Sequence, residues 1–330
     1  MNADRVPGEP PPDLAPMLAT SGTLPVNDDG WAYEMKWDGL RALAYVSGGK
    51  LRLTSRTGRD ITFVYPELAG LSTAVRAQQV VLDGEIVAFG DSPWPDFESL
   101  QQRMNISSAA QARALSAQIP VSYLVFDLLW LDGRSLLDEP YSLRREMLES
   151  LGLDSGRAQV PPSFVGESGA DIQAVSKQQQ LEGIMAKRLS SRYEPGRRTS
   201  AWRKIKNVRS QEVVIGGWKP GEGGRAGWIG SLLVGVHDED GALLYSGHVG
   251  TGFTQQTLRM LGERLAPLRR DTSPFAGTIP PEDARFARWV EPELVADVKF
   301  AAWTKSGRLR APAYKGLRTD KNPEEVIREP

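Results

Sequence analysis

Short apolar runs separated by turn residues recur between Trp31 and about Lys206, a pattern typical of β-strands. Residues 31–37 (WAYEMKW) and 40–46 (LRALAYV) predict two such strands. The Asp38-Gly39 pair lies between them, and Asp-Gly between two apolar runs is a strong signal of a tight hairpin turn. We therefore expect these two segments to pair with each other.

Further strands and one helix are predicted along the same part of the chain. Residues 142–151 (SLRREMLESL) have the spacing of an amphipathic helix. Residues 181–189 and 200–208 flank a basic loop. Five segments predict strands: residues 50–60, in which the strand runs into a glycine turn, 79–89, 121–131, 181–189 and 200–208.

The pattern changes after Arg209, where short strands alternate with tight turns. A single helix is expected over residues 254–265. The expected strands lie within residues 212–218, 230–250 and 293–304. About five short strands with one helix favour a small barrel, for which the oligonucleotide-binding fold (OB-fold) is the first choice.

The length of 330 residues suits two domains, and 40% apolar residues provide for two cores. Residues 1–16 are rich in proline and acid, which is typical of a flexible leader. We therefore expect a leader at 1–16, a first domain at 17–209 and a barrel domain at 210–330.

Composition excludes several kinds of site. The chain has no cysteine, which excludes disulfides, thiolate catalysis and cysteine-ligated zinc, and two histidines are too few for a histidine-rich metal site. The net charge is −1, so any nucleic-acid surface must be local. We find no signal peptide and no apolar run long enough to span a bilayer, so we expect a cytoplasmic monomer without membrane contact.

Lys36 lies in an apolar segment with Glu34 and Asp38 at alternate positions. A neutral lysine amine is a strong nucleophile, but an ordinary lysine, with a pKa near 10.4, is almost entirely protonated at pH 7. Nearby cations or a bound metal are needed to favour the neutral amine. Taken alone, this motif fits a surface lysine on a hairpin as well as a nucleophile.

Other charged residues stand in contexts that suggest anion or metal binding. Lys204 and Lys206 are two apart on a predicted strand and share a face, which suits a phosphate between them or a solvated edge strand. Glu85 and Glu182 lie within apolar segments, where a carboxylate needs a metal ion or a salt bridge. Oxygen ligands favour Mg²⁺ or Mn²⁺.

Residues 187–209 form a basic run in which only Glu194 is acidic. Tryptophan and isoleucine are interleaved with the cations, which favours a binding surface over a solvated charge run. A DNA phosphate backbone is the polyanion that such a surface suits. Nine cations make up this run: Lys187, Arg188, Arg192, Arg197, Arg198, Arg203, Lys204, Lys206 and Arg209.

Lys36-Trp37-Asp38-Gly39, with Arg41 after it, resembles the nucleotidyl-lysine motif of ATP-dependent DNA ligases and mRNA capping enzymes. Other segments resemble the later motifs of that superfamily in the same order, and the resemblance extends from about residue 15 to the end. The nearest resemblance is to the ligase domain of the bacterial end-joining enzyme ligase D. The later motifs are SRTGRD (55–60), LDGEIVAF (82–89), YLVFDLLWLDG (123–133), LEGIMAKR (181–188), WRKIK (202–206) and GLRTDK (316–321).

The resemblance implies an α+β fold, with a nucleotidyltransferase (adenylation) domain of antiparallel sheets and helices followed by an OB-fold barrel. It implies that Lys36 forms a covalent bond to AMP taken from ATP, with Mg²⁺ or Mn²⁺ at Glu85 and Glu182. Phe126 then stacks on adenine. The implied nucleotide-binding residues are Glu34, Arg41, Arg56, Glu85, Phe126, Arg198, Lys204, Lys206, Arg318 and Lys321.

The implied activity is sealing of nicks or breaks in duplex DNA, in double-strand break repair, with a bacterial Ku-type end-binding protein as a partner by analogy. An RNA-end ligase or a capping-type enzyme would use the same lysine chemistry, the latter with GTP. A DNA-end-binding module without catalysis is a third alternative, although the full set of charged motif residues argues against it.

Overall fold

The computed structural model describes all residues except 1–9, 12, 90–93, 105, 154–155, 208, 222–227 and 330. It divides the chain into two compact units, Met1–Asn207 and Val208–Pro330, which we call unit 1 and unit 2. Most of the leader expected at 1–16 lies outside the described residues. The described part of the leader packs on the rest of unit 1, where the hydroxyl of Tyr45 accepts a hydrogen bond from the backbone amide of Leu14.

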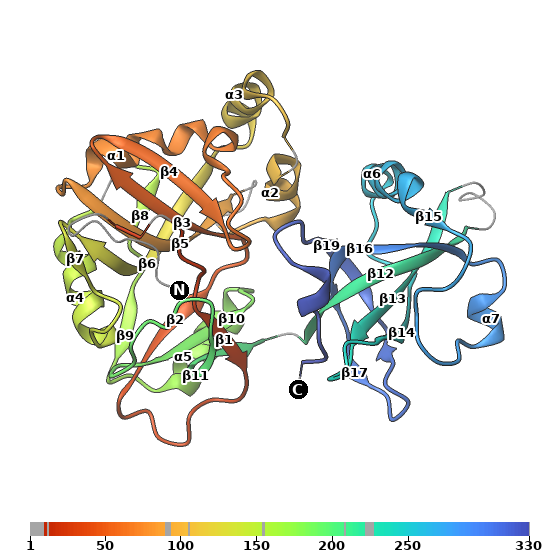
Figure 1. The fold of residues 1–330 in the computed structure, drawn as a ribbon. Helices are drawn as coiled ribbons and strands as arrows, with labels where there is room; N and C mark the ends of the chain where they lie inside the picture. Colours follow the sequence, from red (N-terminus) through yellow and green to blue (C-terminus); the bar gives the residue numbers. More distant parts are fainter. Residues whose placement is uncertain are drawn as a thin grey trace. The chain divides into compact units, whose positions relative to one another are not determined.

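Unit 1 contains two sheets, which we call sheet I and sheet II (Figure 1). Sheet I has the order β1 (Leu18–Ser21), β11 (Arg198–Lys206), β10 (Gly183–Arg188), β2 (Trp31–Lys36), β9 (Ser163–Val165). Sheet II has the order β4 (Lys50–Ser55), β3 (Leu40–Ser47), β5 (Gln79–Ala88), β6 (Val121–Leu131), β7 (Arg134–Ser135), and β8 (Ala158–Gln159) also pairs with β6.

The hairpin predicted across Asp38-Gly39 is wrong, because β2 pairs with β10 and β9 in sheet I whereas β3 pairs with β4 and β5 in sheet II. A two-residue hairpin of the Asp-Gly type needs a positive φ at its glycine, and Gly39 does not have one. The glycine is needed for close approach instead. A Cβ at Gly39 would lie 2.3 Å from the carbonyl oxygen of Ile86 on β5.

Both sheets are covered on their outer faces, which explains their apolar sequences. The outer face of sheet II packs a core that includes Leu82 and Ile86, and the segment with α1 (Leu71–Ala74), α2 (Phe97–Met104) and α3 (Ala109–Gln118) contributes Leu71, Leu100 and Ala112 to it. On the outer face of sheet I, Tyr33 and Ile184 pack with Ile172 of α5 (Gly169–Gln178). The inner faces meet through a third cluster.

That third cluster joins the two sheets. Leu43 and Val81 of sheet II pack there with Trp202 of sheet I, and the Phe126 ring meets the Trp202 ring edge-on at 6.2 Å between centroids. The inner faces are therefore rigidly held by apolar contacts, and charged side chains on them lie in a largely dry environment.

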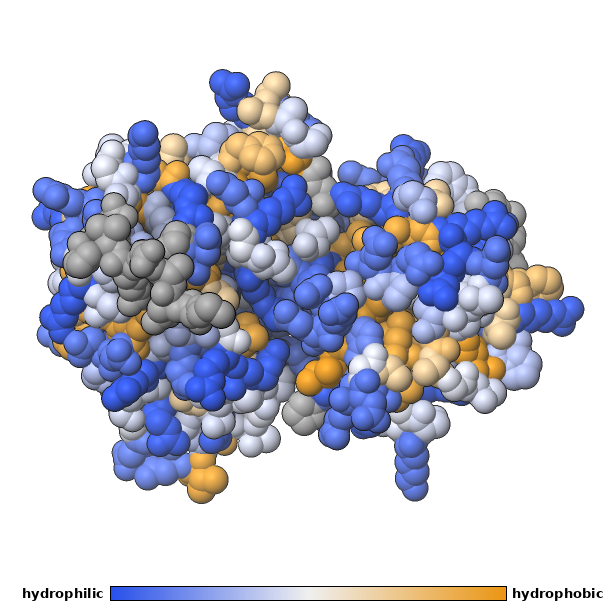
Figure 2. Space-filling view, in the orientation of Figure 1, coloured by the Kyte–Doolittle hydropathy of each residue, from blue (hydrophilic) through white to orange (hydrophobic). Residues whose placement is uncertain are grey.

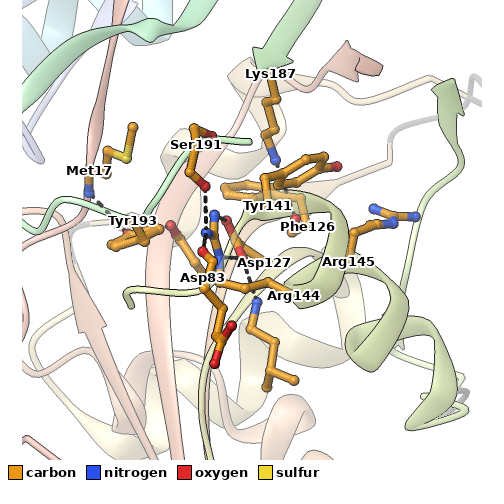
Figure 3. Close-up of polar contacts among 12 residues, drawn as sticks. Met17, Asp83, Phe126, Asp127, Tyr141, Arg144, Arg145, Lys187, Ser191 and Tyr193 are labelled. Atoms are coloured by element: carbon orange, nitrogen blue, oxygen red, sulfur yellow. Dashed lines mark hydrogen bonds and ion pairs between the residues drawn. The ribbon is translucent and has the colours of Figure 1, made fainter. Parts of the chain in front are cut away.

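The helix predicted over 142–151 is confirmed as α4 (Tyr141–Ser150). It is tied to sheet II by a fully buried ion pair, in which Arg144 donates two 2.8 Å hydrogen bonds to the carboxylate of Asp127 on β6. The same guanidinium donates to the carbonyl oxygens of Glu139 and Ser191. Figure 3 shows Arg144, Asp127 and Ser191 converging in this way.

Unit 2 has the strand order of the expected OB-fold. The order β14 (Leu243–Val249), β13 (Ile229–His237), β12 (Ser210–Pro220), β16 (Arg288–Lys299), β15 (Arg269–Arg270) is completed by β19 (Ala313–Leu317), which pairs with β16. A bridge between Thr251 and Ala313 brings the end of β14 to β19, so the sheet closes on itself. Strands β12, β13, β14, β16 and β19 surround one core, which includes Val234 and Val298, and form the barrel.

The helix expected over 254–265 is α6 (Gln255–Leu265), for which the Thr254 hydroxyl accepts a hydrogen bond from the Thr257 amide as N-cap. Unit 2 contains a second, short helix that the sequence pattern did not predict, α7 (Pro281–Ala284). Between β16 and β19 the chain forms a small hairpin of β17 (Ala302–Trp303) and β18 (Leu309–Arg310).

The buried Asp127–Arg144 pair predicts an asymmetric response to substitution. We expect Arg144→Met to lower the free energy of unfolding of unit 1 by roughly 3–5 kcal/mol, because it leaves the Asp127 carboxylate buried and uncompensated. The double variant Asp127→Leu/Arg144→Met removes both charges and is expected to recover most of this loss. Urea unfolding, with amide hydrogen exchange to identify the transition of unit 1, measures both effects.

Arg134 and Glu139 form the control, because their ion pair is 58% and 30% exposed. We expect Arg134→Ala to cost less than about 1 kcal/mol, as exposed pairs do. A cost for Arg144→Met no larger than that of this control would show that α4 does not depend on the buried pair.

Candidate active site

The three central strands of sheet I bring distant charged residues into two rows. One row across β2, β10 and β11 is Glu34, Met185 and Lys204, and the next is Lys36, Gly183 and Lys206. Because directly paired residues and residues two apart share a face, Glu34, Lys36, Lys204 and Lys206 all project to the inner face. The structure thus brings together residues separated by about 170 positions in the sequence.

Lys36 forms an ion pair with Glu182, with 2.5 Å between Nζ and a carboxylate oxygen. The two side chains are 20% and 13% exposed, so the pair is accessible but mostly enclosed. Gly183 makes this arrangement possible, because a Cβ there would lie 2.1 Å from the carbonyl oxygen of Ile205 on β11. The predicted nucleophile and one predicted metal ligand are therefore neighbours.

Glu34 is buried at the centre of a second charged cluster. Its carboxylate accepts a 2.8 Å ion pair from Lys187 on β10 and a short hydrogen bond from the hydroxyl of Tyr141 on α4, and Arg145 lies 3.6 Å away. Burial, with the charge of Glu34, raises the pKa of Tyr141 well above its ordinary value, so the hydroxyl keeps its proton. The carboxylate of Glu34 is thus held from two sides.

Lys187 was expected on a basic surface, and this expectation is wrong because its side chain is 1% exposed. The amine lies 4.4 Å from the centroids of both the Phe126 and the Trp202 rings, and donates to the carbonyl oxygen of Phe126 at 3.3 Å. Figure 3 shows the Lys187 side chain extending from its strand towards Phe126 and Tyr141. Burial lowers the pKa of the Lys187 amine, and Glu34 offsets this only in part.

Arg41 is tied to the inner face of sheet II. Its guanidinium binds the carboxylate of Asp83 through two hydrogen bonds of 3.0 and 2.6 Å, and Tyr193 donates to the same carboxylate at 2.6 Å. Burial by itself would lower the pKa of Arg41, but Asp83 with Tyr193 and Glu85 raises it. The guanidinium carbon lies 5.4 Å from the centroid of the Phe126 ring.

Glu85 and Arg56 lie near Arg41 in sheet II. Arg41 and Glu85 are direct partners across β3 and β5, and a Cβ at Gly39 would lie 2.8 Å from the Glu85 side chain, so Glu85 borders the segment that follows Lys36. Arg56 directly follows Ser55, the last residue of β4, and Ser55 pairs with Ala42, the residue after Arg41 on β3. Phe126, Arg41, Glu85 and Arg56 thus approach the inner face from sheet II.

Three predicted residues are not part of this group. Arg198 begins β11, eight residues before Lys206 and on the order of 20–25 Å from it along the strand, and it donates to the carbonyl oxygen of Ala19 at 2.7 Å. Arg318 and Lys321 belong to unit 2, where they pair with Asp320 at 2.8 Å and with Glu212 at 2.7 Å.

The Arg318–Asp320 pair shows that these residues are not a loose tail, because Asp320 is 2% exposed. Burial by itself would raise the pKa of Asp320, but Arg318 outweighs it and the pKa lies below its ordinary value.

No group of three or more histidines, cysteines or acids gathers as a metal cage among the described residues. Glu85 and Glu182 are compatible with magnesium in a different way, since this ion commonly takes one or two carboxylates and completes its shell with phosphate oxygens and water. No helix within the described part of the chain is long and apolar enough to cross a membrane.

Sequence reasoning missed four residues that hold the predicted ones in place: Asp83, Tyr141, Arg145 and Tyr193. Asp83 had a detectable signal, because it is a carboxylate inside an apolar strand and needs a partner there. Tyr141 and Tyr193 had none, since a tyrosine in an apolar segment is ordinary core.

Comparison with known proteins accounts for this arrangement. Residues 16–206 match the family model of the ATP dependent DNA ligase domain, and residues 225–321 match the ATP dependent DNA ligase C terminal region. The chain belongs to the ATP-dependent DNA ligase family. The two matched regions fall in unit 1 and unit 2, and the fold expected for this family is confirmed in both.

Several relatives within the family are bacterial end-joining proteins. The chain is 44% identical over 318 residues to the multifunctional non-homologous end joining DNA repair protein LigD of Mycobacterium tuberculosis, and 35% identical over 321 residues to LigD of Pseudomonas aeruginosa. Each match covers 96% of this chain but only 40% and 36% of those proteins. The chain therefore spans less than half the length of these relatives.

A solved structure covers the same extent. Mycobacterial DNA ligase D complexed with ATP and MES is 43% identical to this ligase-family chain, with a TM-score of 0.69, and the match covers 96% of this chain and 98% of that one. The resemblance to the ligase domain of ligase D is thus confirmed, in both sequence and fold.

The burial of Lys187 beside Glu34 predicts a pH-dependent loss of stability. We expect Glu34→Leu to lower the free energy of unfolding by roughly 3–5 kcal/mol at pH 7, because an unpaired ammonium is then buried. Burial places the folded-state pKa of Lys187 below its unfolded value. At a pH between the folded-state and unfolded-state pKa of Lys187, the unfolded chain binds more protons than the folded chain, so the free energy of unfolding rises with pH. The destabilisation caused by Glu34→Leu therefore becomes smaller as the pH approaches about 10. Urea unfolding from pH 7 to 10 tests this.

The double variant Glu34→Leu/Lys187→Met is the control, because it removes the titrating amine. Its stability relative to the single variant is expected to be higher at pH 7, and this advantage disappears as the pH rises. A difference between the two variants that stays constant with pH would contradict the assignment.

Proposed function

We propose that this chain is an ATP-dependent DNA ligase that seals nicks or broken ends in duplex DNA through a covalent AMP on Lys36. The observation that carries the proposal is the position of Lys36, which ends β2 beside Glu182 on a face shared with Glu34, Lys204 and Lys206. Membership of the ligase family and the likeness to an ATP-bound ligase D support it.

In the first step, the amine of Lys36 forms a bond to the α-phosphorus of ATP while the bond to the bridging oxygen breaks and pyrophosphate leaves. An ammonium paired with a carboxylate has no free electron pair, so the Lys36–Glu182 pair must open and the proton must leave before attack. Lys204 and Lys206 on the same face supply positive charge for the α-phosphate. A Mg²⁺ or Mn²⁺ ion held by Glu182 and Glu85 would neutralise phosphate charge.

Base and sugar recognition falls to the residues around the inner faces. Phe126 provides an aromatic surface for adenine, and Glu34 provides a fixed carboxylate beside it. Arg41 and Arg56 suit the ribose and phosphate region. Arg198 is a weaker candidate, because it lies at the opposite end of β11 from Lys206 and binds the backbone of β1.

The later steps use DNA. The AMP passes from Lys36 to the 5′-phosphate at the break, and the 3′-hydroxyl then attacks that phosphate, forms the phosphodiester bond and releases AMP. The names of the end-joining relatives support a role in double-strand break repair and DNA recombination. A Ku-type end-binding protein is the partner that such a role suggests.

An RNA-end ligase or capping-type enzyme is less well supported, because the relatives are DNA ligases. The choice of labelled nucleotide separates the two: a capping-type enzyme labels itself with GTP, whereas the proposed ligase uses ATP.

The assignment of Lys36 predicts a separation of steps. We expect Lys36→Ala to abolish transfer of label from α-labelled ATP to the protein, since no other group supplies the attacking amine. Sealing of a nick that already carries a 5′-adenylate is expected to persist, because that step needs positioning rather than the lysine nucleophile. Both reactions are followed on one preparation.

Lys177→Ala is a suitable control, because Lys177 lies on α5, on the outer side of sheet I. Its self-labelling is expected to match that of the wild type. Wild-type labelling of the Lys36→Ala protein would exclude Lys36 as the nucleophile.

Lys321 is proposed to assist departure of pyrophosphate in the first step only. We expect Lys321→Ala to slow formation of the lysine–AMP adduct at least tenfold and to change sealing of a pre-adenylated nick by less than about threefold, as expected for a residue that completes the site for one step. Rates of both reactions, at one salt concentration, provide the test. Arg318 shares the proposed role, but its removal would also leave Asp320 buried without a partner.

Glu212→Gln serves as the matched variant, because it weakens the same ion pair and retains the Lys321 cation. Its adduct formation is expected to stay within about threefold of the wild type. Equal losses of both reactions in Lys321→Ala would indicate a general folding or DNA-binding role.

A further inference from the structure

Glu182 lies in the turn between α5 and β10, one residue before β10 begins at Gly183. The ladder of sheet I starts at Gly183, which pairs with Lys36 on one side and with Lys206 on the other. Glu182 is therefore outside the register that fixes the sheet. Its carboxylate nevertheless meets the amine of Lys36, so further contacts must hold its backbone in place.

The turn before Glu182 has a backbone conformation that its sequence does not favour. Helix α5 ends in a Schellman motif, in which the amide of Gln180 donates to the carbonyl oxygen of Lys177 at 3.0 Å. The amide of Leu181 donates to the carbonyl oxygen of Ser176 at 2.9 Å. Gln180 occupies the position that usually carries glycine, with a φ of 57°. A left-handed backbone is disfavoured for a residue with a Cβ, so the turn needs support from outside.

Asn207 and Ser176 supply that support. The side-chain amide of Asn207 donates to the Ser176 hydroxyl at 2.8 Å and to the carbonyl oxygen of Leu181 at 2.9 Å. The backbone amide of Asn207 donates to the carbonyl oxygen of Glu182 at 2.8 Å. The Ser176 hydroxyl in turn donates to the carbonyl oxygen of Gly183 at 2.9 Å. These two residues, which we call the turn clamp, thus bind three successive carbonyl groups centred on that of Glu182.

The direction of each hydrogen bond in the turn clamp is fixed. A serine hydroxyl has one hydrogen, which Ser176 gives to Gly183, so the hydroxyl must accept the bond from Asn207. A carbonyl oxygen can only accept, so the Asn207 side chain must present its nitrogen to Leu181. Ser176 is 0% exposed, so water cannot replace a partner that it loses.

The turn clamp adds a polar link to an apolar one. Figure 1 shows α5 beside β10 and β11, and Figure 2 shows mostly hydrophilic side chains over this part of unit 1. Ile172 of α5 packs on Ile184 and Ile205 of the sheet. These apolar contacts fix the helix against the sheet, and the turn clamp acts at the end of the helix, where the chain passes to Glu182.

We propose that Asn207 and Ser176 are positioning residues, which hold the Glu182 carboxylate where it meets Lys36 and the metal ion. This inference rests on the proposed function and deepens it by naming residues that act through Glu182. A carboxylate on a fixed backbone binds a cation without first losing freedom of movement, whereas a mobile carboxylate loses that freedom on binding. Removal of the hydrogen bonds that orient a metal ligand typically weakens metal binding or activity roughly 10- to 100-fold.

The first test is the magnesium requirement of self-labelling by the full chain. We expect Asn207→Ala and Ser176→Ala each to raise the free Mg²⁺ concentration for half-maximal labelling of Lys36 by about tenfold, with the rate at saturating Mg²⁺ within about threefold of the wild type. The saturated rate is retained because neither variant removes a group proposed to touch the nucleotide. Ser176→Ala is well suited to the test, since alanine favours a helix more than serine does.

The second test needs neither ATP nor a metal ion. The amides of Leu181 and Asn207 are hydrogen-bonded in the turn, and we expect them to be protected from hydrogen exchange in the wild-type chain. In both variants these two amides are expected to exchange at least about tenfold faster, as in a local opening, whereas amides in the middle of β10 keep their wild-type rates. This measurement reports on the turn clamp without relying on activity.

Thr62→Val is the matched control, because it removes a comparable support beside β4 in sheet II. The Thr62 hydroxyl accepts a hydrogen bond from the amide of Leu53 at 2.9 Å and donates one to Asp60 at 2.6 Å. Its loss of stability, measured by urea unfolding, is the reference for a purely structural effect. Its magnesium requirement is expected to equal that of the wild type.

The outcomes separate this inference from the proposed function. A wild-type chain that does not label itself overturns the proposed function, and this inference with it. A wild-type chain that labels itself, with an unchanged magnesium requirement in both Asn207→Ala and Ser176→Ala, overturns the positioning role alone. Unchanged hydrogen exchange in both variants also overturns it, because the turn would then not depend on these residues. So does an equal rise in the magnesium requirement of Thr62→Val, since the effect would then follow from general destabilisation.

Discussion

The ion pair between Lys187 and Glu34 joins β10 to β2 at the centre of unit 1, between two sheets that otherwise meet through apolar side chains. A buried charge is strongly destabilising unless an opposite charge lies beside it. A buried cation on one strand therefore requires an acidic side chain on a neighbouring strand. Tyr141 and Phe126 are placed around this pair, through a hydrogen bond and a ring contact. The geometry of the proposed adenine site therefore depends on it.

The proposed catalytic groups, in contrast, are engaged in ion pairs that a nucleotide would replace. Lys36 holds Glu182, and Lys321 holds Glu212 in the other unit. In a nucleotide complex, phosphate groups would replace the glutamates as partners of the lysines, and a metal ion would replace the lysines as partner of a glutamate. The Glu34 and Asp127 carboxylates are far more deeply buried and are suited to a fixed supporting role. The degree of burial thus separates the residues that position from those proposed to react.

Periodicity in the sequence predicted β10, β11 and α4 well, because each buries one side against a core and the residue pattern follows directly. It failed at Asp38-Gly39, where a hairpin signal marks a crossing between two sheets. An Asp-Gly pair is compatible with a hairpin turn and with a crossing between two sheets. Which of the two forms depends on the strands with which β2 and β3 pair, here β10 and β5. Lys187 was misplaced for a similar reason, since its burial depends on Glu34, which lies about 150 residues earlier in the chain.

By itself, the sequence determined the ligase family and the types of charged residue available, because these follow from composition and from the order of motifs. Only the tertiary structure decided which charges meet. Register across β2, β10 and β11 placed Lys36 beside Glu182 and Glu34 beside Lys187. The same register brought Asn207 against the turn that carries Glu182. Pairing between strands is a long-range property, and no local pattern of residues specifies it.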